Sequence, residues 1–214
     1  MKAEYLSHFG NDLMIVNAAR VSHGKWKEEF DTQDAKLILY LAKHKHESPF
    51  FHPQAQFRIT APIFVARQWF RHEVGFSRNE QSRRYVYDVP ELFYPDNWRA
   101  RPDKSIKQGS GEVIRGQASA NIKAIVESAE EECLDAYEML LEKNVAPEQA
   151  RMVLPQSMYT TWIETASLMA YARLCRLRLD GHTQSETRDL AKQINEKMAE
   201  LFPVSWSALM EKPE

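Results

Sequence analysis

Glycine is scarce in this chain, with seven among 214 residues. No GxGxxG motif and no GxxxxGK[ST] motif occurs, so neither a Rossmann cofactor site nor a Walker-type phosphate loop is supported. Backbone cradles for phosphate are therefore few. Any phosphate group would have to be held mainly by guanidinium groups and helix N-termini.

Cysteine is rarer still, and Cys133 and Cys175 form no CxxC pair. This count excludes a disulfide framework and a cysteine zinc site, and it favours a reducing cytoplasm. The acidic neighbours of Cys133 disfavour a thiolate, and the helical neighbours of Cys175 favour a buried structural thiol. We expect neither cysteine to be a nucleophile.

Long apolar runs are also missing: no window approaches the roughly 20 apolar residues that span a bilayer. The formal net charge of −2 argues against a general polyanion binder. We therefore expect a soluble protein without membrane or nucleic-acid partners. The hydrophobic content of 43% suffices for one core, and we predict a single domain over residues 1–214.

Several catalytic signatures are absent too. The histidines His44, His46 and His52 have no HExxH context, so no metal site is predicted. No serine lies in a GxSxG elbow, which disfavours acyl transfer. The carboxylates at 127, 130 and 131 share a helical face that we interpret as solvated and not as a magnesium site.

The periodicities predict an α+β fold with helices packed on a mixed or antiparallel sheet. Alternation over 54–60 and aromatic, β-branched content over 159–163 indicate strands. Helices are expected over 32–46, 63–72, 112–143 and 166–178, with a short one from Pro147 and a last one capped by Thr183 and Glu186. Residues 88–111 hold three prolines, which indicates a long surface excursion, a candidate lid.

The most informative segment runs from Arg67 to Tyr85 and contains five arginines, one histidine and four aromatic residues. It is expected where a helix passes into a loop containing Gly75. Arginine binds phosphate through two parallel hydrogen bonds and stacks on flat rings, so a nucleotide is the ligand class that fits. The rings of Trp69 and Phe70 are expected in the core, and not against a flavin.

This segment resembles the signature of the flavin-dependent thymidylate synthases, carried by Arg71-His72, Ser77, Asn79-Glu80, Ser82 and Arg84-Tyr85. Further blocks of the same family follow in order at 18–22, 48–52, 150–155 and 177–184. Two features depart from the family pattern. Glu73 stands where the family usually has arginine, and the spacing from His72 to Ser82 is one residue longer.

The resemblance implies reductive methylation of dUMP to dTMP, with FAD as hydride relay and with 5,10-methylenetetrahydrofolate and NADPH as co-substrates. It also implies a homotetramer with active sites shared between subunits. Arg178 matches the family arginine that stabilises negative charge on the pyrimidine. An arginine would do so electrostatically, since it stays protonated.

The other site residues follow from the same resemblance. The expected dUMP contacts are Gln68, Trp69, Phe70, Arg71, Glu80, Gln81, Ser82, Arg83, Arg84, Arg151 and Arg178. The expected FAD contacts are His52, Gln54, Arg71, His72, Glu73, Glu80, Ser167 and Arg173. Ser82 is expected to position the pyrimidine, because no base adjoins its hydroxyl.

Two other classes of protein remain as alternatives. A nucleic-acid-binding module would use the arginines on phosphates and Phe76, Tyr85 or Tyr87 to stack on bases. A nucleotide hydrolase would need a second acidic cluster and a divalent metal, and the sequence offers no such cluster.

Overall fold

The computed structural model describes residues 1–86, 88–103 and 109–211. Its centre is a four-stranded antiparallel sheet in the order β1-β2-β4-β3. The strands are β1 (Lys2–Phe9), β2 (Gln54–Pro62), β3 (Phe76–Glu80) and β4 (Tyr159–Ser167). The expected α+β architecture is confirmed, and the sheet is wholly antiparallel among the described residues.

Eight α-helices accompany the sheet in the described part of the chain. They are α1 (Asp12–Arg20), α2 (Thr32–Lys43), α3 (Ile63–Trp69), α4 (Gly116–Glu142), α5 (Pro147–Ala150), α6 (Leu168–Arg178), α7 (Ser185–Leu201) and α8 (Pro203–Met210). The described residues also form three short 3₁₀ helices: η1 (Val21–His23), η2 (Ser48–Phe51) and η3 (Arg151–Val153).

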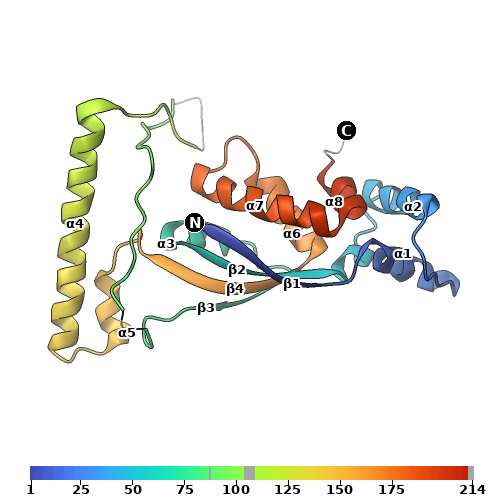
Figure 1. Cartoon of the computed structure of the whole chain (residues 1–214), viewed down its shortest axis with the longest axis horizontal. Coiled ribbons are helices and arrows are strands. Elements are labelled where there is room, and N and C mark those ends of the chain that lie inside the picture. Colours follow the sequence, from blue (N-terminus) through green and yellow to red (C-terminus); the bar gives the residue numbers. More distant parts are fainter. Residues whose placement is uncertain (87, 104–108, 212–214) are drawn as a thin grey trace.

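The core lies between the sheet and the helices α3, α6, α7 and α8, which Figure 1 shows on one side of the sheet. The predicted alternation in β2 is confirmed, because Ala55, Phe57 and Ile59 are all buried. Their side chains face the helices, whereas Gln56 hydrogen-bonds Thr165 on the other side of the sheet. Helix α6 contributes an almost fully buried face to the same core.

Several sequence expectations were wrong in detail. The segment 76–80 is a strand and not a loop, because it pairs with the second half of β4. Helix α6 starts at Leu168 instead of 166, because β4 runs on to Ser167. Thr183 does not cap α7; its hydroxyl donates to the carbonyl of Leu177. The elements β1, α1 and α8 were not predicted.

Helix α4 is the longest helix described, as expected, but it stands apart from the core at one edge of the molecule (Figure 1). Only Glu130 and Tyr137 are buried along its 27 residues, and Ile125 is 69% exposed. The apolar stripe of α4 therefore has little to pack against within one chain.

The predicted excursion at 88–111 lacks helices in its described part. It is anchored by two isolated β-bridges, Leu92 with Met158 and Arg99 with Val113. Residues 87 and 104–108 of this region lie outside the described residues. No described helix combines the length and apolar character that a membrane span requires.

Candidate active site

The C-terminal ends of α3 and α6 meet at a cluster that we call the Arg178 cluster: Arg178, His72, Gln68 and Thr187. Arg178 Nε donates to His72 Nε2 at 2.9 Å, and Arg178 Nη2 donates to the Gln68 carbonyl at 3.2 Å. Thr187 Oγ1 in turn donates to the Gln68 side-chain carbonyl. The guanidinium is therefore fixed from two sides by acceptors on one segment.

The electrostatics of the cluster keep His72 neutral. Burial, together with the charges of Arg178 and Arg78, lowers the pKa of His72 to about 4. A neutral imidazole can accept through Nε2, which is what the bond from Arg178 requires. Burial and the neighbouring Arg71 also lower the pKa of Arg178, so the site holds positive charge that an anion would stabilise.

Two residues that were not singled out from the sequence support this cluster. Glu164, in the middle of β4, is fully buried and accepts from Arg78 Nε at 2.8 Å. Arg78 Nη1 donates to the backbone carbonyl of His72 at 2.6 Å. One signal was present in the sequence: Glu164 is the one acidic residue in an otherwise uncharged run, 159–167.

The rings of Trp69 and Phe70 belong to the core. Trp69 is fully buried and its indole donates to Glu164, while Phe70 packs edge-on against Trp162 with 5.0 Å between centroids. This agrees with their interpretation as core residues. Because the Trp69 ring is closed off from solvent within the chain, a contact of Trp69 with dUMP would have to involve its backbone.

Two of the remaining predicted dUMP residues lie on β3 and on η3. Glu80, the last residue of β3, accepts from Thr160 Oγ1 at 2.8 Å. Arg151 donates to the Glu148 carbonyl at 3.3 Å, and its side chain is exposed. Neither contact joins its residue to the Arg178 cluster.

The other predicted dUMP residues follow β3 directly in the chain, at 81–84. Arg83 donates to the Asp88 carbonyl, and Arg84 lies 5.2 Å from the centroid of the Tyr85 ring. The Ser82 hydroxyl accepts from the backbone NH of Arg84 at 3.3 Å. Gln81 and Arg84 are exposed, so this segment presents polar and charged groups to solvent.

Several of the predicted FAD residues lie near one end of the sheet, whereas Glu80 lies at the other end of β3, opposite Trp162. Gln54 opposes Ser167 in the register of β2 and β4, and Ser167 NH donates to the carbonyl of Gly75 at 3.4 Å. The loop that carries Arg71, His72 and Glu73 therefore reaches this end of the sheet. His52 and Gln54 are exposed beside it.

Two of the predicted FAD residues have structural partners of their own. The Ser167 hydroxyl caps α6 by accepting from Ala170 NH at 3.2 Å. Arg173 pairs with Glu47 and lies over the ring of Phe51.

The two cysteines have different surroundings, and the expected burial of Cys175 is confirmed. Cys175 is fully buried, and burial together with Glu164 raises its pKa well above the ordinary value. Cys133 is half-buried on α4, the helix that stands apart from the core (Figure 1).

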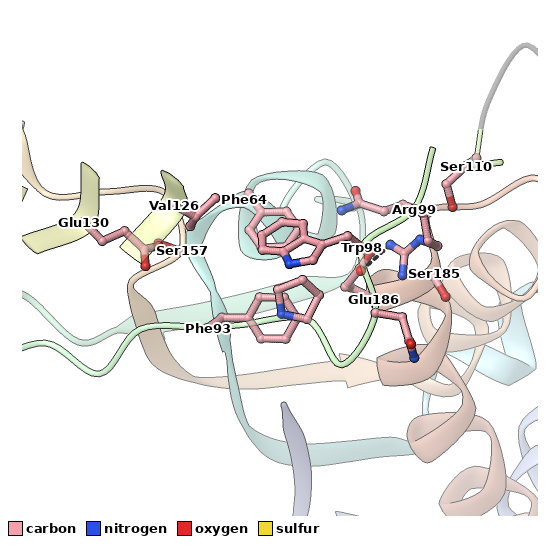
Figure 2. Close-up of a pocket in the computed structure, with 14 residues that line it drawn as sticks. Phe64, Phe93, Trp98, Arg99, Ser110, Val126, Glu130, Ser157, Ser185 and Glu186 are labelled. Atoms are coloured by element: carbon pink, nitrogen blue, oxygen red, sulfur yellow. Dashed lines mark hydrogen bonds and ion pairs between the residues drawn. The ribbon is translucent and has the colours of Figure 1, made fainter. Parts of the chain in front are cut away.

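A cavity of about 580 Å³ lies between α3, α4, α7 and residues 93–99 and 109–110. Figure 2 shows Phe64, Phe93 and Trp98 gathered at its centre, with Arg99 and Glu186 at one end and Glu130 beside Ser157 at the other. None of its lining residues was predicted as a site residue, and it does not include the Arg178 cluster. Among the described residues, no group of three or more His, Cys, Asp or Glu side chains is arranged to hold a metal.

Comparison with known proteins identifies the relatives of this chain. Residues 4–204 match the family model described as thymidylate synthase complementing protein. The chain is 39% identical over 206 residues to a flavin-dependent thymidylate synthase of Thermus thermophilus, covering 96% of this chain and 74% of that protein. It is also 39% identical over 201 residues to the enzyme of that name from Thermosipho africanus, covering 94% and 87%.

A solved structure shares the fold. The crystal structure of a UMP/dUMP methylase PolB from Streptomyces cacaoi, bound with 5-Br dUMP, superimposes with a TM-score of 0.85 at 30% identity. The match covers 97% of this chain and 93% of the methylase. The chain belongs to the thymidylate synthase complementing protein family, that of the flavin-dependent thymidylate synthases.

Proposed function

We propose that this protein converts dUMP to dTMP by reductive methylation, with FAD as hydride carrier, 5,10-methylenetetrahydrofolate as carbon donor and NADPH as reductant. The observation that carries the proposal is Arg178, a guanidinium held by His72 and by the Gln68 carbonyl. Family membership and the dUMP-analogue complex of the PolB methylase support the same substrate.

The proposed role of Arg178 is to stabilise negative charge electrostatically. Negative charge develops on the pyrimidine when it is activated, and a prearranged guanidinium stabilises that charge without having to reorganise. Because Nε and Nη2 are held by acceptors on the α3 side, Arg178 has a defined orientation before substrate binds. The neutral His72 fixes this orientation without competing for the substrate's negative charge.

The residues at the end of the sheet fit an anionic dinucleotide cofactor. FAD carries a pyrophosphate, and this part of the chain offers the exposed guanidinium of Arg71 and the half-exposed Arg173. His52, Gln54 and His72 add further polar side chains in this part of the chain. Bound FAD, once reduced by NADPH, would supply the hydride, and these side chains would bind and orient it.

We further propose a homotetramer that shares its active sites, in a cytoplasmic protein. Within one chain, the contacts described for Ser82 and for Arg151 are local and do not join either residue to the Arg178 cluster. A second subunit could bring the exposed Arg151 and Arg84 to the Arg178 cluster of the first. The exposed apolar positions of α4, such as Ile125, offer a surface that subunit contact would cover.

The test is the visible absorption spectrum of the purified protein with FAD, recorded anaerobically. Flavin should bleach with NADPH and reoxidise with formation of dTMP after dUMP and methylenetetrahydrofolate are added. UMP serves as the comparison substrate, because the structural neighbour is a UMP/dUMP methylase. No retained flavin and no methylated product would refute the proposal, and steeply salt-dependent binding of polynucleotides would then favour the nucleic-acid alternative.

A further inference from the structure

Glu164 has an unusual environment for a carboxylate, since it lies in β4, one of the two inner strands of the sheet, with no solvent exposure. Three of the described side chains donate to it. Trp69 Nε1 lies 3.0 and 3.1 Å from its two oxygens, Trp162 Nε1 donates at 3.0 Å, and Arg78 Nε donates at 2.8 Å. Of these donors only Arg78 brings a compensating charge, so the buried carboxylate and this guanidinium depend on each other.

Arg78 is restrained by two aromatic rings and by a backbone carbonyl as well as by Glu164. Its guanidinium carbon lies 4.4 Å from the centroid of Phe76 and 5.2 Å from that of Phe70. Its Nη1 donates to the carbonyl of His72 at 2.6 Å. Arg78 therefore ties β3 to the backbone of the loop that joins α3 to β3.

The chain of contacts continues to the proposed catalytic group. The His72 ring accepts from Arg178 Nε at 2.9 Å. The path from Glu164 to Arg178 thus has three links, each a short polar contact: Glu164 to Arg78, Arg78 to His72, and His72 to Arg178. If the contact between Glu164 and Arg78 shifts, the His72 backbone held by Arg78 shifts too. The His72 ring, which accepts from Arg178, is then displaced.

We propose that Glu164 and Arg78 are a positioning pair that sets the place of His72 and, through it, the orientation of Arg178. The inference rests on the proposed role of Arg178 and goes beyond it, because neither Glu164 nor Arg78 is expected to touch dUMP or FAD. The pair determines turnover through geometry.

The test compares three variants in the full-length protein with FAD. Glu164→Gln keeps the size and one acceptor oxygen but removes the charge that holds Arg78. We expect kcat for dTMP formation to fall about 100-fold, since a displacement of about 1 Å can cost that much, with a much smaller change in the KM for dUMP. Glu164→Gln with Arg78→Gln leaves no unpaired buried charge, so this double variant keeps the test open if the single variant does not fold.

Asp34→Asn is the matched control. Asp34 is another fully buried carboxylate, paired with Arg20 and Lys27 at 2.8 and 2.6 Å, on α2. Its loss should lower the melting temperature and leave kcat per folded site unchanged.

A second readout separates positioning from general loss of stability. The His72 ring is faced by Arg178 from α6 and Arg78 from β3, with Arg71 and Glu73 as chain neighbours. In ¹³C-histidine NMR spectra, the His72 pKa of about 4 should rise toward 6.5 in the Glu164 variants, because the ring leaves Arg178 and gains solvent. The His72 pKa should be unchanged in Asp34→Asn.

The outcomes are distinguishable. Wild-type kcat and an unmoved His72 titration in folded Glu164 variants would overturn the positioning pair. If the wild-type protein itself makes no dTMP, the proposed function fails instead, and the NMR titration still decides whether the pair places His72.

Discussion

At the scale of single residues, the arginines of this protein differ in what surrounds them and not in their chemistry. Arg178 is half-buried and donates to two acceptors, Arg78 lies near the rings of Phe70 and Phe76, and Arg71 is exposed. Motif spacing pointed to Arg178 and Arg71. It did not point to Arg78, because the role of Arg78 depends on Glu164, which lies 86 residues away in the chain.

Arg178→Ala should lose dTMP formation by a factor of about 100 to 1000, the range seen when a donor to a developing anion is removed. FAD binding should persist, because the other predicted flavin contacts remain. Flavin absorbance and product formation, measured on the same sample, check both parts. Arg176→Ala is the control from the same helical turn: its Nε donates to the Leu209 carbonyl, so stability should fall and turnover should persist. Wild-type turnover by Arg178→Ala would rule out the assignment.

Folding stability should depend on His72 between pH 4 and pH 6.5. The pKa of His72 falls from 6.5 to about 4 on folding, so the unfolded chain binds the proton more tightly in this window. Stability is therefore independent of His72 above pH 6.5 and falls as the pH drops toward 4. Urea unfolding of the wild type at several pH values should show a steeper loss than His72→Gln. The exposed His23→Gln is the comparison, and equal slopes for wild type and His72→Gln would contradict the expectation.

Replacing both cysteines should leave catalysis intact. Cys175 is buried and protonated, and its Sγ contacts only a backbone carbonyl among its described polar partners. The variant Cys133→Ser with Cys175→Ala should show turnover close to wild type, with a modest loss of stability from the small cavity at Cys175. Loss of activity in the folded double variant would instead indicate thiol chemistry.

At the scale of elements, local signals placed most helices but not the strand that organises the site. Asp31 caps α2 with a full capping box, and Pro147 begins α5, as their residue types predict. Strand β3 was missed because Phe76–Glu80 is mostly polar and half-exposed. Its extended form comes from pairing with β4, which no local pattern shows.

At the same scale, Gly75 constrains the loop that joins α3 to β3. Its φ is +84°, and a Cβ there would lie 2.9 Å from Ala170 Cβ and 3.3 Å from Ser167 Oγ at the start of α6. Gly75→Ala should therefore cost more than the roughly 1–2 kcal/mol expected for positive φ alone, and should displace the loop and reduce flavin binding. Gly24→Ala is the matched control, because Gly24 has φ +63° and open space around it. Chemical unfolding of both variants gives the comparison, and equal losses would show that the contact with α6 is unimportant.

At the scale of the whole molecule, the question is which chain completes each site. Arg151 lies on η3 beside α5, and Arg178 lies at the end of α6. Within one chain, Arg151 has only its local bond to Glu148 among the contacts described. In the proposed homotetramer, Arg151 of one chain and Arg178 of another would bind the same nucleotide.

Mixing two inactive variants tests this arrangement. If Arg151 and Arg178 of one site come from different subunits, Arg151→Ala and Arg178→Ala should restore about a quarter of wild-type activity when equal amounts are unfolded and reassembled together. His72→Ala with Arg178→Ala is the control, because these two side chains contact each other within one chain and no mixture can complete the pair. Light scattering should report four chains per particle. A monomer, or no recovery in the first mixture, would contradict shared sites.

The sequence alone identified the family and placed β2, the start of β4 and most of the helices, because motifs, caps and alternation are local patterns with local physical causes. It also placed Trp69 in the core from its residue type. Only the tertiary structure decided that Glu164 lies under Arg78, that His72 is neutral and that Arg178 has two fixed acceptors. These features depend on burial and on contacts between strands and helices far apart in the chain, where desolvation sets both charge and orientation.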